Sequence, residues 1–296
     1  MILMHIGLPK TATTTLQKEL FPRICDPDVS YVGVIQPRVE IQDPLYTQIY
    51  SAICAGTDPE SARDALIKTM QEKVRLIISE EMFTVSTSNS TWAEKLRRLR
   101  SLLDGLNYMI LCTVREPANA AFSYFTELHD RIFARKLSLA EAVASHEAMR
   151  IYKYAEFLPA LDELFGEERV YIKTFTSIVE NEVDDIMGFI GVDPRIKVSF
   201  RTNNSKRTAG EKVFTGRGLS AADLVRGLAR GIPGRSSNLL RAAKRKTAPM
   251  IRAMDSWVLK QNFVRKPSEN EINRIREHFC GDWDYCKARI SRQISA

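Results

Sequence analysis

The chain has 296 residues, of which 44% are hydrophobic and 27% are charged, and its formal net charge is +7. This composition is typical of a globular protein with a sizeable core, and it excludes a disordered or fibrous chain. Five scattered cysteines without a CxxC pair, and four histidines without HExxH spacing, predict reduced thiols and no bound metal.

The sequence also predicts where the protein resides. It contains no run of about 18 apolar residues, the length that a membrane helix needs. The apolar run at its start is too short for the hydrophobic region of a signal peptide. We therefore expect a cytoplasmic, bacterial protein.

Short apolar runs alternate with segments of helical periodicity along the chain. The apolar runs predict strands at residues 2–6, 30–35, 74–79, 108–114 and 170–175. The periodic segments predict helices at 13–20, 59–73, 92–103, from 117 onward, at 139–165 with a break near Pro159, at 179–190 and within 268–290. This alternation predicts a three-layer α/β fold, with a central parallel sheet of about five strands flanked by helices, similar to P-loop NTPases. We expect one domain over residues 1–296, with a basic, mobile or partly helical insertion at about 206–250.

A polar loop follows the first predicted strand and runs from Gly7 to Thr15, with the sequence GLPKTATTT. A loop between a strand and a helix directs main-chain N–H groups and the positive end of the helix at one point, which favours an anion. Lys10 adds a positive charge, and four threonine hydroxyls add donors. A polar turn with threonine caps is the alternative. An ordinary nucleoside-triphosphate loop does not fit, because Lys10 follows Gly7 by three residues rather than six and the second glycine is missing.

A second candidate anion site follows the predicted strand 108–114. Arg115 stands at the carboxyl end of this strand, where parallel sheets bind ligands, and Ser123 comes eight residues later. A guanidinium fork with a hydroxyl suits a phosphate monoester. The alternative is an arginine paired with a surface carboxylate.

Two adjacent carboxylates, Glu80 and Glu81, follow the predicted strand 74–79. Their mutual repulsion would raise the pKa of one carboxyl towards the range of a general base. Successive residues point to opposite faces, so we expect one of the two to enter the site. A solvated acidic turn is the alternative, and His129 is a further, weaker candidate for the base.

The segments HIGLPKTATTTLQ and VREPANAAFSYF resemble, in order and spacing, the two nucleotide-binding elements of the sulfotransferase family. Members of this family use 3′-phosphoadenosine 5′-phosphosulfate (PAPS) as the sulfuryl donor, without a metal. The resemblance implies that Arg115 and Ser123 hold the 3′-phosphate and that Lys10 contacts the bridging oxygen in catalysis. It also implies that the 5′-phosphosulfate is bound by Lys10, Thr11, Ala12, Thr13, Thr14 and Thr15.

The same resemblance extends to the candidate base and to the reaction. The segment ISEEMF is similar to a bacterial SSExF pattern, which implies Glu81 as the base and leaves Glu80 as the second choice. Ala12 departs from the family, which usually has glycine there. The resemblance covers about residues 1–205 and the last helix. It implies sulfuryl transfer from PAPS to a hydroxyl or amine, with adenosine 3′,5′-bisphosphate (PAP) as the product. We expect a carbohydrate or glycolipid acceptor.

The segment from Lys206 to Arg252 holds twelve Lys or Arg residues against two acidic residues, so the rest of the chain has a net charge of about −3. Three interpretations stay open: a solvated surface, a lid that binds an anionic glycan or lipid head group, and peripheral contact with an anionic membrane. A nucleic-acid binder ranks third among the functions, because the segment lacks interleaved aromatic residues. The rival enzyme is a nucleoside or sugar kinase with a divergent phosphate loop.

Overall fold

The computed structural model describes residues 1–35, 42–128, 137–192, 208–209, 212–214 and 263–295. The chain divides into two compact units. The first comprises Met1–Tyr124, Ser138–Thr202 and Glu269–Ala296, and the second comprises Phe125–Leu137 and Asn203–Ser268. The predicted insertion falls in the second unit, and most of it lies outside the described residues, as does His129.

The first unit is built on a parallel sheet of five strands in the order β2-β3-β1-β4-β5. Ile2 of β1 pairs with Leu76 of β3 on one side and with Tyr108 of β4 on the other. This arrangement confirms the predicted parallel α/β sheet. The carboxyl ends of β1 and β4 lie side by side at the centre of the sheet, where such folds bind ligands. The strands are β1 (Ile2–His5), β2 (Val29–Tyr31), β3 (Arg75–Ser79), β4 (Tyr108–Val114) and β5 (Val170–Thr174).

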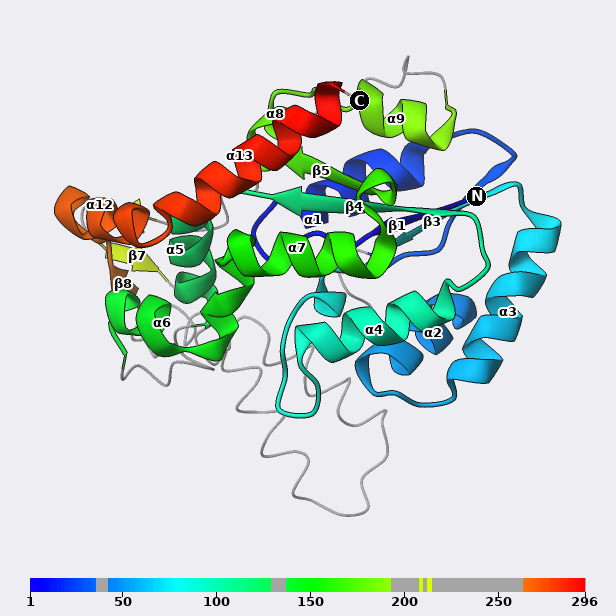
Figure 1. Ribbon diagram of the computed structural model, residues 1–296, viewed down its shortest axis with the longest axis horizontal. Helices are drawn as coiled ribbons and strands as arrows, with labels where there is room; N and C mark the ends of the chain where they lie inside the picture. Colours follow the sequence, from blue (N-terminus) through cyan, green and yellow to red (C-terminus); the bar gives the residue numbers. More distant parts are fainter. Residues whose placement is uncertain (36–41, 129–136, 193–207, 210–211, 215–262, 296) are drawn as a thin grey trace, which may run out of the picture. The chain divides into compact units, whose positions relative to one another are not determined.

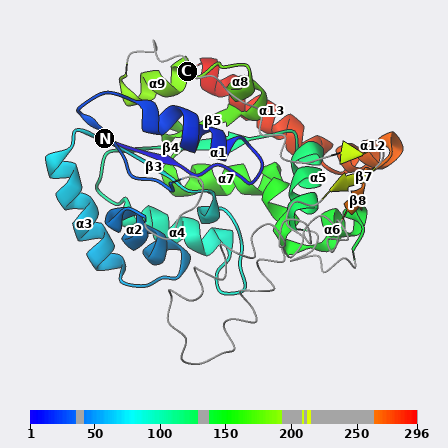
Figure 2. The same ribbon diagram turned by 180° about the vertical axis from the view of Figure 1, so that it is seen from behind.

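Helices cover both faces of this sheet, as Figures 1 and 2 show from opposite sides. The helical segment after β1 and helix α9 lie on one face, and α2, α4 and α7 lie on the other. The segment after β1 comprises α1 (Thr13–Thr15), η1 (Leu16–Leu20) and η2 (Phe21–Arg23). The other helices of the first half are α2 (Pro44–Cys54), α3 (Pro59–Glu72), η3 (Glu81–Phe83), α4 (Trp92–Leu102) and α5 (Pro117–Leu128). Those of the second half are α6 (Leu139–Ser145), η4 (Glu147–Tyr152), α7 (Tyr154–Phe165), η5 (Glu167–Arg169), α8 (Phe175–Val179), α9 (Asp184–Ile190), α12 (Glu269–His278) and α13 (Cys280–Ser295).

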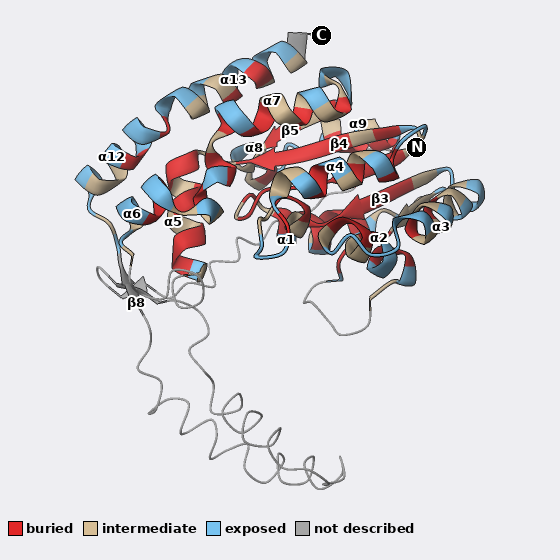
Figure 3. Ribbon diagram, turned by 60° about the horizontal axis from the view of Figure 1, so that its bottom comes forward, coloured by how far each residue is buried: buried red, intermediate tan, exposed pale blue. Residues whose placement is uncertain are grey.

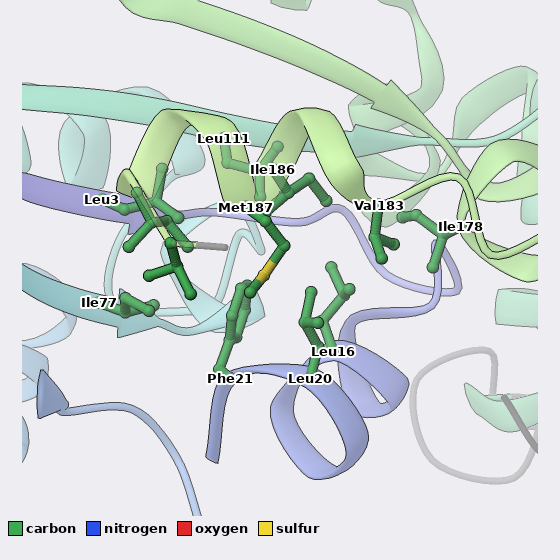
Figure 4. Packing of buried hydrophobic residues seen from close by; sticks show 12 residues of the cluster. Leu3, Leu16, Leu20, Phe21, Ile77, Leu111, Ile178, Val183, Ile186 and Met187 are labelled. Atoms are coloured by element: carbon green, nitrogen blue, oxygen red, sulfur yellow. The ribbon is translucent and has the colours of Figure 1, made fainter. Parts of the chain in front are cut away.

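A buried apolar cluster fixes the helical segment after β1 against the sheet. Leu16 and Leu20 of η1 pack with Met187 of α9 over Leu3 and Leu111 of the central strands (Figure 4). The central strands are buried along their length, whereas the covering helices keep exposed outer faces (Figure 3). The loop before Thr13 is therefore held between a buried strand and a buried helix, which fixes both of its ends.

The structure corrects the predicted break near Pro159, because α7 runs through this residue. Phe157, Leu158 and Leu161 are fully buried on this helix. Their burial contributes roughly 1.5–3 kcal/mol each, which outweighs the cost of about 3 kcal/mol for an interior proline. The break comes earlier, at Lys153, between η4 and α7.

The structure also corrects the predicted helix 179–190, which begins later, at Asp184. Helix α8 ends at Val179 and α9 begins at Asp184, with Asn181 in the left-handed conformation between them (φ 64°). The interruption lets Ile178 and Val183 enter the same core, although five residues along one helix would place them on different sides. Gly191 is the C-cap of α9 and adopts the left-handed conformation, at φ 68°.

The described part of the second unit holds a small antiparallel sheet in the order β6-β7-β8. Its strands are β6 (Thr208–Ala209), β7 (Lys212–Phe214) and β8 (Phe263–Arg265). In the part of the chain that the structure describes, no helix is long and apolar enough to cross a membrane.

Candidate functional site

The loop after β1 has a strained backbone. Lys10 and Ala12 both adopt positive φ angles, 67° and 70°, a conformation that costs an L-residue about 1 kcal/mol. The carbonyl of Ala12 accepts hydrogen bonds from Thr15 N at 2.9 Å and Leu16 N at 3.1 Å, so the helix starts directly behind it. The amide groups of a first helical turn have no acceptor within the helix. The start of this helix therefore lies directly behind the left-handed turns of the loop.

The four threonines of the loop do not play equivalent parts. Thr11 is fully buried, and its hydroxyl donates to the carbonyl of Leu8 at 2.6 Å. Thr13 is also buried, and its hydroxyl donates to the same carbonyl at 3.4 Å. Thr14 is exposed and Thr15 half-buried. The hydroxyls of Thr11 and Thr13 thus serve the loop itself, although the sequence suggests four donors for a ligand.

The second element, after β4, lies against the first. Arg115 Nη1 donates to the carbonyl of Lys10 at 3.4 Å. The guanidinium carbon of Arg115 lies 4.2 Å from the centre of the Phe175 ring, which is the first residue of α8. Burial lowers the pKa of Arg115, but an arginine stays protonated at neutral pH. The structure therefore brings the two predicted anion elements together and presents a stacked, partly desolvated cation between them.

Two tyrosines brace these elements from one side. Tyr152 donates its hydroxyl to the carbonyl of Pro9 at 3.0 Å, and Tyr154 donates to the carbonyl of Arg115 at 2.6 Å. The Arg115 amide donates back to the Tyr154 hydroxyl at 3.3 Å, and burial raises the pKa of this tyrosine. Residues two apart on an α-helix point in nearly opposite directions. The break at Lys153 is what lets both rings reach the same edge of the sheet.

The start of α5 is organised by Glu116, which follows Arg115. Its carboxylate accepts hydrogen bonds from the amides of Ala118 at 3.2 Å and Asn119 at 2.9 Å. This cap fixes the direction in which α5 leaves the sheet. Ser123 lies in the second turn of this helix and is half-buried.

The two adjacent carboxylates differ in their surroundings, as their alternation predicts. Glu80 is fully buried. It accepts a hydrogen bond from the amide of Met82 at 2.8 Å and another from the hydroxyl of Tyr46. Glu81 is half-buried and begins the short helix η3. Glu80 is thus anchored within the protein, whereas Glu81 reaches the partly open side of the turn.

A buried lysine supports the turn that carries both carboxylates. Lys95 Nζ donates to the carbonyls of Met82 at 3.0 Å and Val85 at 2.6 Å. Desolvation is the main cause that lowers the pKa of Lys95, and the nearby Glu80 opposes it. The lysine therefore fixes the path of the backbone after β3.

The sequence analysis did not identify several residues that shape the site: Tyr46, Lys95, Tyr152, Tyr154 and Phe175. Each acts on a residue that lies at least 13 positions away in the chain. Local patterns carry no such signal, although two tyrosines separated by one residue are inconsistent with a single buried helix face. Among the described residues, no group of three or more His, Cys, Asp or Glu side chains could hold a metal ion.

No family model matches the sequence, and no curated protein matches it. The structure is similar to solved sulfotransferases. One, from Alicyclobacillus acidocaldarius, is 17% identical, with a TM-score of 0.45 over 69% of this chain and 86% of the other. The mouse sulfotransferase SULT7A1, solved with PAP, is 14% identical (TM-score 0.36) over 65% of this chain and 59% of the other. The sulfotransferase domain of the curacin biosynthetic pathway is 14% identical (TM-score 0.37), over 94% of this chain and 96% of the other.

Proposed function

We propose that this protein is a sulfotransferase that moves a sulfuryl group from PAPS to a hydroxyl or amine of an acceptor. The observation that carries the proposal is the junction of two anion-binding elements. Arg115, at the end of β4, donates to the carbonyl of Lys10 in the loop after β1. A nucleotide with phosphates at its 3′ and 5′ positions needs two such elements side by side.

The loop after β1 suits the 5′-phosphosulfate. Lys10, Thr11, Ala12, Thr13, Thr14 and Thr15 form the loop and the helix start, whose main-chain amides favour an anion. Thr11 would contribute through its amide, because its hydroxyl is engaged with Leu8. Arg115 suits the 3′-phosphate through its guanidinium fork. Ser123 would add a hydroxyl from α5.

The chemistry is an in-line displacement at sulfur. The acceptor oxygen forms a bond to sulfur, the bond from sulfur to the 5′-phosphate oxygen breaks, and PAP leaves. Lys10 would neutralise charge on the leaving oxygen, and Glu81 would take the proton that the acceptor hydroxyl loses. Glu81 fits the role of base better than Glu80, because its side chain is half-buried whereas that of Glu80 is fully buried.

Thermal unfolding with added nucleotides tests the donor. We expect adenosine 3′,5′-bisphosphate to raise the melting temperature, because a ligand that binds only the folded state stabilises it. We expect ATP with Mg²⁺ to have a much smaller effect. Stabilisation by ATP–Mg²⁺ alone would instead favour a nucleoside or sugar kinase and overturn the proposal.

Turnover of PAPS tests the residues. Lys10→Ala should lower kcat by about 100- to 1000-fold, the usual effect of losing a group that stabilises transition-state charge. The matched control is Lys18→Ala, since Lys18 is exposed on the helix that follows the same loop.

Glu81→Gln should lower kcat by a similar factor without weakening PAP binding. Loss of turnover in Glu80→Gln alone would transfer the role of base to Glu80.

We propose a carbohydrate or glycolipid as the acceptor, in a cytoplasmic enzyme that can associate peripherally with a membrane. Twelve basic residues against two acidic ones between Lys206 and Arg252 support an anionic partner. Co-sedimentation with vesicles containing anionic lipid at low salt tests the membrane contact. Absence of binding there would leave only the soluble glycan as the partner.

A further inference from the structure

A chain of buried side chains runs beneath the loop after β1. Gln17 Nε2 lies 3.1 Å from Ser79 Oγ, which lies 2.7 Å from His5 Nδ1. On the other side of the ring, His5 Nε2 lies 3.3 Å from Thr113 Oγ1, which lies 2.7 Å from Thr11 Oγ1. The chain connects the carboxyl ends of β1, β3 and β4 with the loop and with the helix after it.

The Leu8 end of this chain fixes the direction of its hydrogen bonds as far as the imidazole ring. The carbonyl of Leu8 can only accept, so the Thr11 hydroxyl donates to it at 2.6 Å. Thr11 must then accept from the Thr113 hydroxyl, which leaves the oxygen of Thr113 to accept from His5 Nε2. At the other end, the amide nitrogen of Gln17 can only donate to Ser79. The Ser79 oxygen accepts from Gln17 and keeps its own hydrogen, which it can donate to an unprotonated His5 Nδ1.

This direction determines where one proton of the ring lies. The ring must carry a proton on Nε2, because the Thr113 hydroxyl donates to Thr11 and can only accept from the ring. His5 is fully buried, and this burial lowers its pKa to about 3. The ring is therefore neutral at physiological pH, with its one proton on Nε2 and an unprotonated Nδ1.

This hydrogen-bonded chain ends at Leu8, two residues before the first left-handed residue of the loop, Lys10. Leu8 donates its amide to the carbonyl of Thr113 at 3.1 Å, and its own carbonyl accepts from Thr11. Gly7 lies directly above the contact between the ring and Thr113. A Cβ on Gly7 would stand 2.3 Å from Thr113 Oγ1 and 2.8 Å from His5 Nε2. The position of the loop is therefore determined from below by this chain.

We propose that His5, as the Nε2–H tautomer, is a positioning residue that fixes the phosphate-binding loop through Thr113 and Thr11. The inference depends on the proposed function for the identity of the anion above the loop. The direction of the hydrogen bonds does not depend on it. A satisfied buried network is rigid, so the loop keeps its left-handed turns before any ligand binds.

Long-range ¹H–¹⁵N correlation spectra of the ligand-free protein test the tautomer. We expect the ¹⁵N shift of a protonated Nε2 and an unprotonated Nδ1 for His5, unchanged between pH 8 and 6. A proton on Nδ1, or a mixture of both tautomers, would overturn the inference. This result is independent of which nucleotide the protein binds.

The variant Thr113→Val tests the positioning role, because valine keeps the shape of threonine and removes the hydroxyl. We expect its affinity for adenosine 3′,5′-bisphosphate, measured by calorimetry, to fall by about three- to tenfold, and the His5 tautomer to become mixed. The matched control is Thr69→Val on α3, where the lost hydroxyl donates to the carbonyl of Ala65, and it should bind as the wild type does.

Equal affinity of Thr113→Val and the wild type would overturn the positioning role. If the wild type itself fails to bind the bisphosphate, the proposed function fails. In that case the tautomer measurement still decides whether the directed chain exists.

Discussion

The turns after β1 and after β4 differ in what they offer to the two ends of the proposed donor. The turn after β1 offers main-chain amides, shaped by left-handed residues at Lys10 and Ala12 and supported from below by buried side chains. The turn after β4 offers one side chain, Arg115, held by an aromatic ring and by a neighbouring carbonyl. The first site should therefore be sensitive to changes in geometry, and the second to loss of a single group.

Truncation of side chains tests this difference most strongly. Arg115→Ala should lower the affinity for adenosine 3′,5′-bisphosphate by about 10- to 150-fold, because hydrogen bonds to charged groups contribute about 1.5–3 kcal/mol. Thr14→Ala, at an exposed position of the other turn, should cost about fivefold or less. Calorimetric titration measures both. Similar losses in the two variants would show that the first turn depends on its side chains as much as the second does.

A substitution that crowds the backbone should instead affect the turn after β1 strongly. Gly7→Ala places a Cβ 2.3 Å from Thr113 Oγ1 and 2.6 Å from Thr13 Oγ1, so the loop must shift. We expect the free energy of unfolding to fall by about 1–3 kcal/mol and nucleotide affinity to fall with it. In Gly188→Ala the new Cβ meets no atom within 4 Å, and this helix should gain about 0.5–1 kcal/mol. Urea unfolding of both variants measures the contrast, and equal stabilities would contradict it.

The neutral ring of His5 should make stability depend on pH. Burial lowers the pKa of His5 from 6.5 to about 3, so the unfolded state binds the proton first as the pH falls. Stability is therefore complete above pH 6.5 and decreases below it, by about 2 kcal/mol at pH 5. His5→Gln should lack this part of the slope. We propose to compare urea unfolding of both proteins between pH 7 and 5, above the range where most carboxylates titrate, and parallel curves would refute the assignment.

Relief of strain should give the smallest effect. Ala12→Gly removes the cost of a positive φ, 70° in this structure, and should raise the free energy of unfolding by about 0.5–1 kcal/mol. Ala65→Gly, in the interior of α3, should lower it by about 1 kcal/mol. A stability loss in Ala12→Gly as large as that in Ala65→Gly would mean that the left-handed turn carries no strain.

Local sequence patterns predicted those parts of the fold that are determined locally. The apolar run 108–114 is strand β4 with the same bounds, because it is buried on both faces. Helix α2 was missed, although Asp43 caps it and Pro44 is its first residue. The effects of Pro159 and of the segment 179–183 were predicted wrongly, because burial of neighbouring side chains in the core decided both.

The candidate site was predictable to a smaller extent. Lys10, Arg115 and the two glutamates stand at the ends of strands, a position that the chain order reveals. The bracing tyrosines and the two contacts of the His5 ring join residues at least 39 positions apart. Only the three-dimensional structure shows such pairs, and only it shows that two of the threonine hydroxyls point below the loop.

The break in the backbone at Lys153 has a consequence for ligand choice. The two rings on either side of it hold Pro9 and Arg115, so one short segment sets the separation between the two turns that we propose as anion sites. A nucleotide such as ATP places all its phosphates on one end and leaves the guanidinium without a counterion. Discrimination between donors would then arise from where the negative charges lie on the nucleotide, rather than from how many it has.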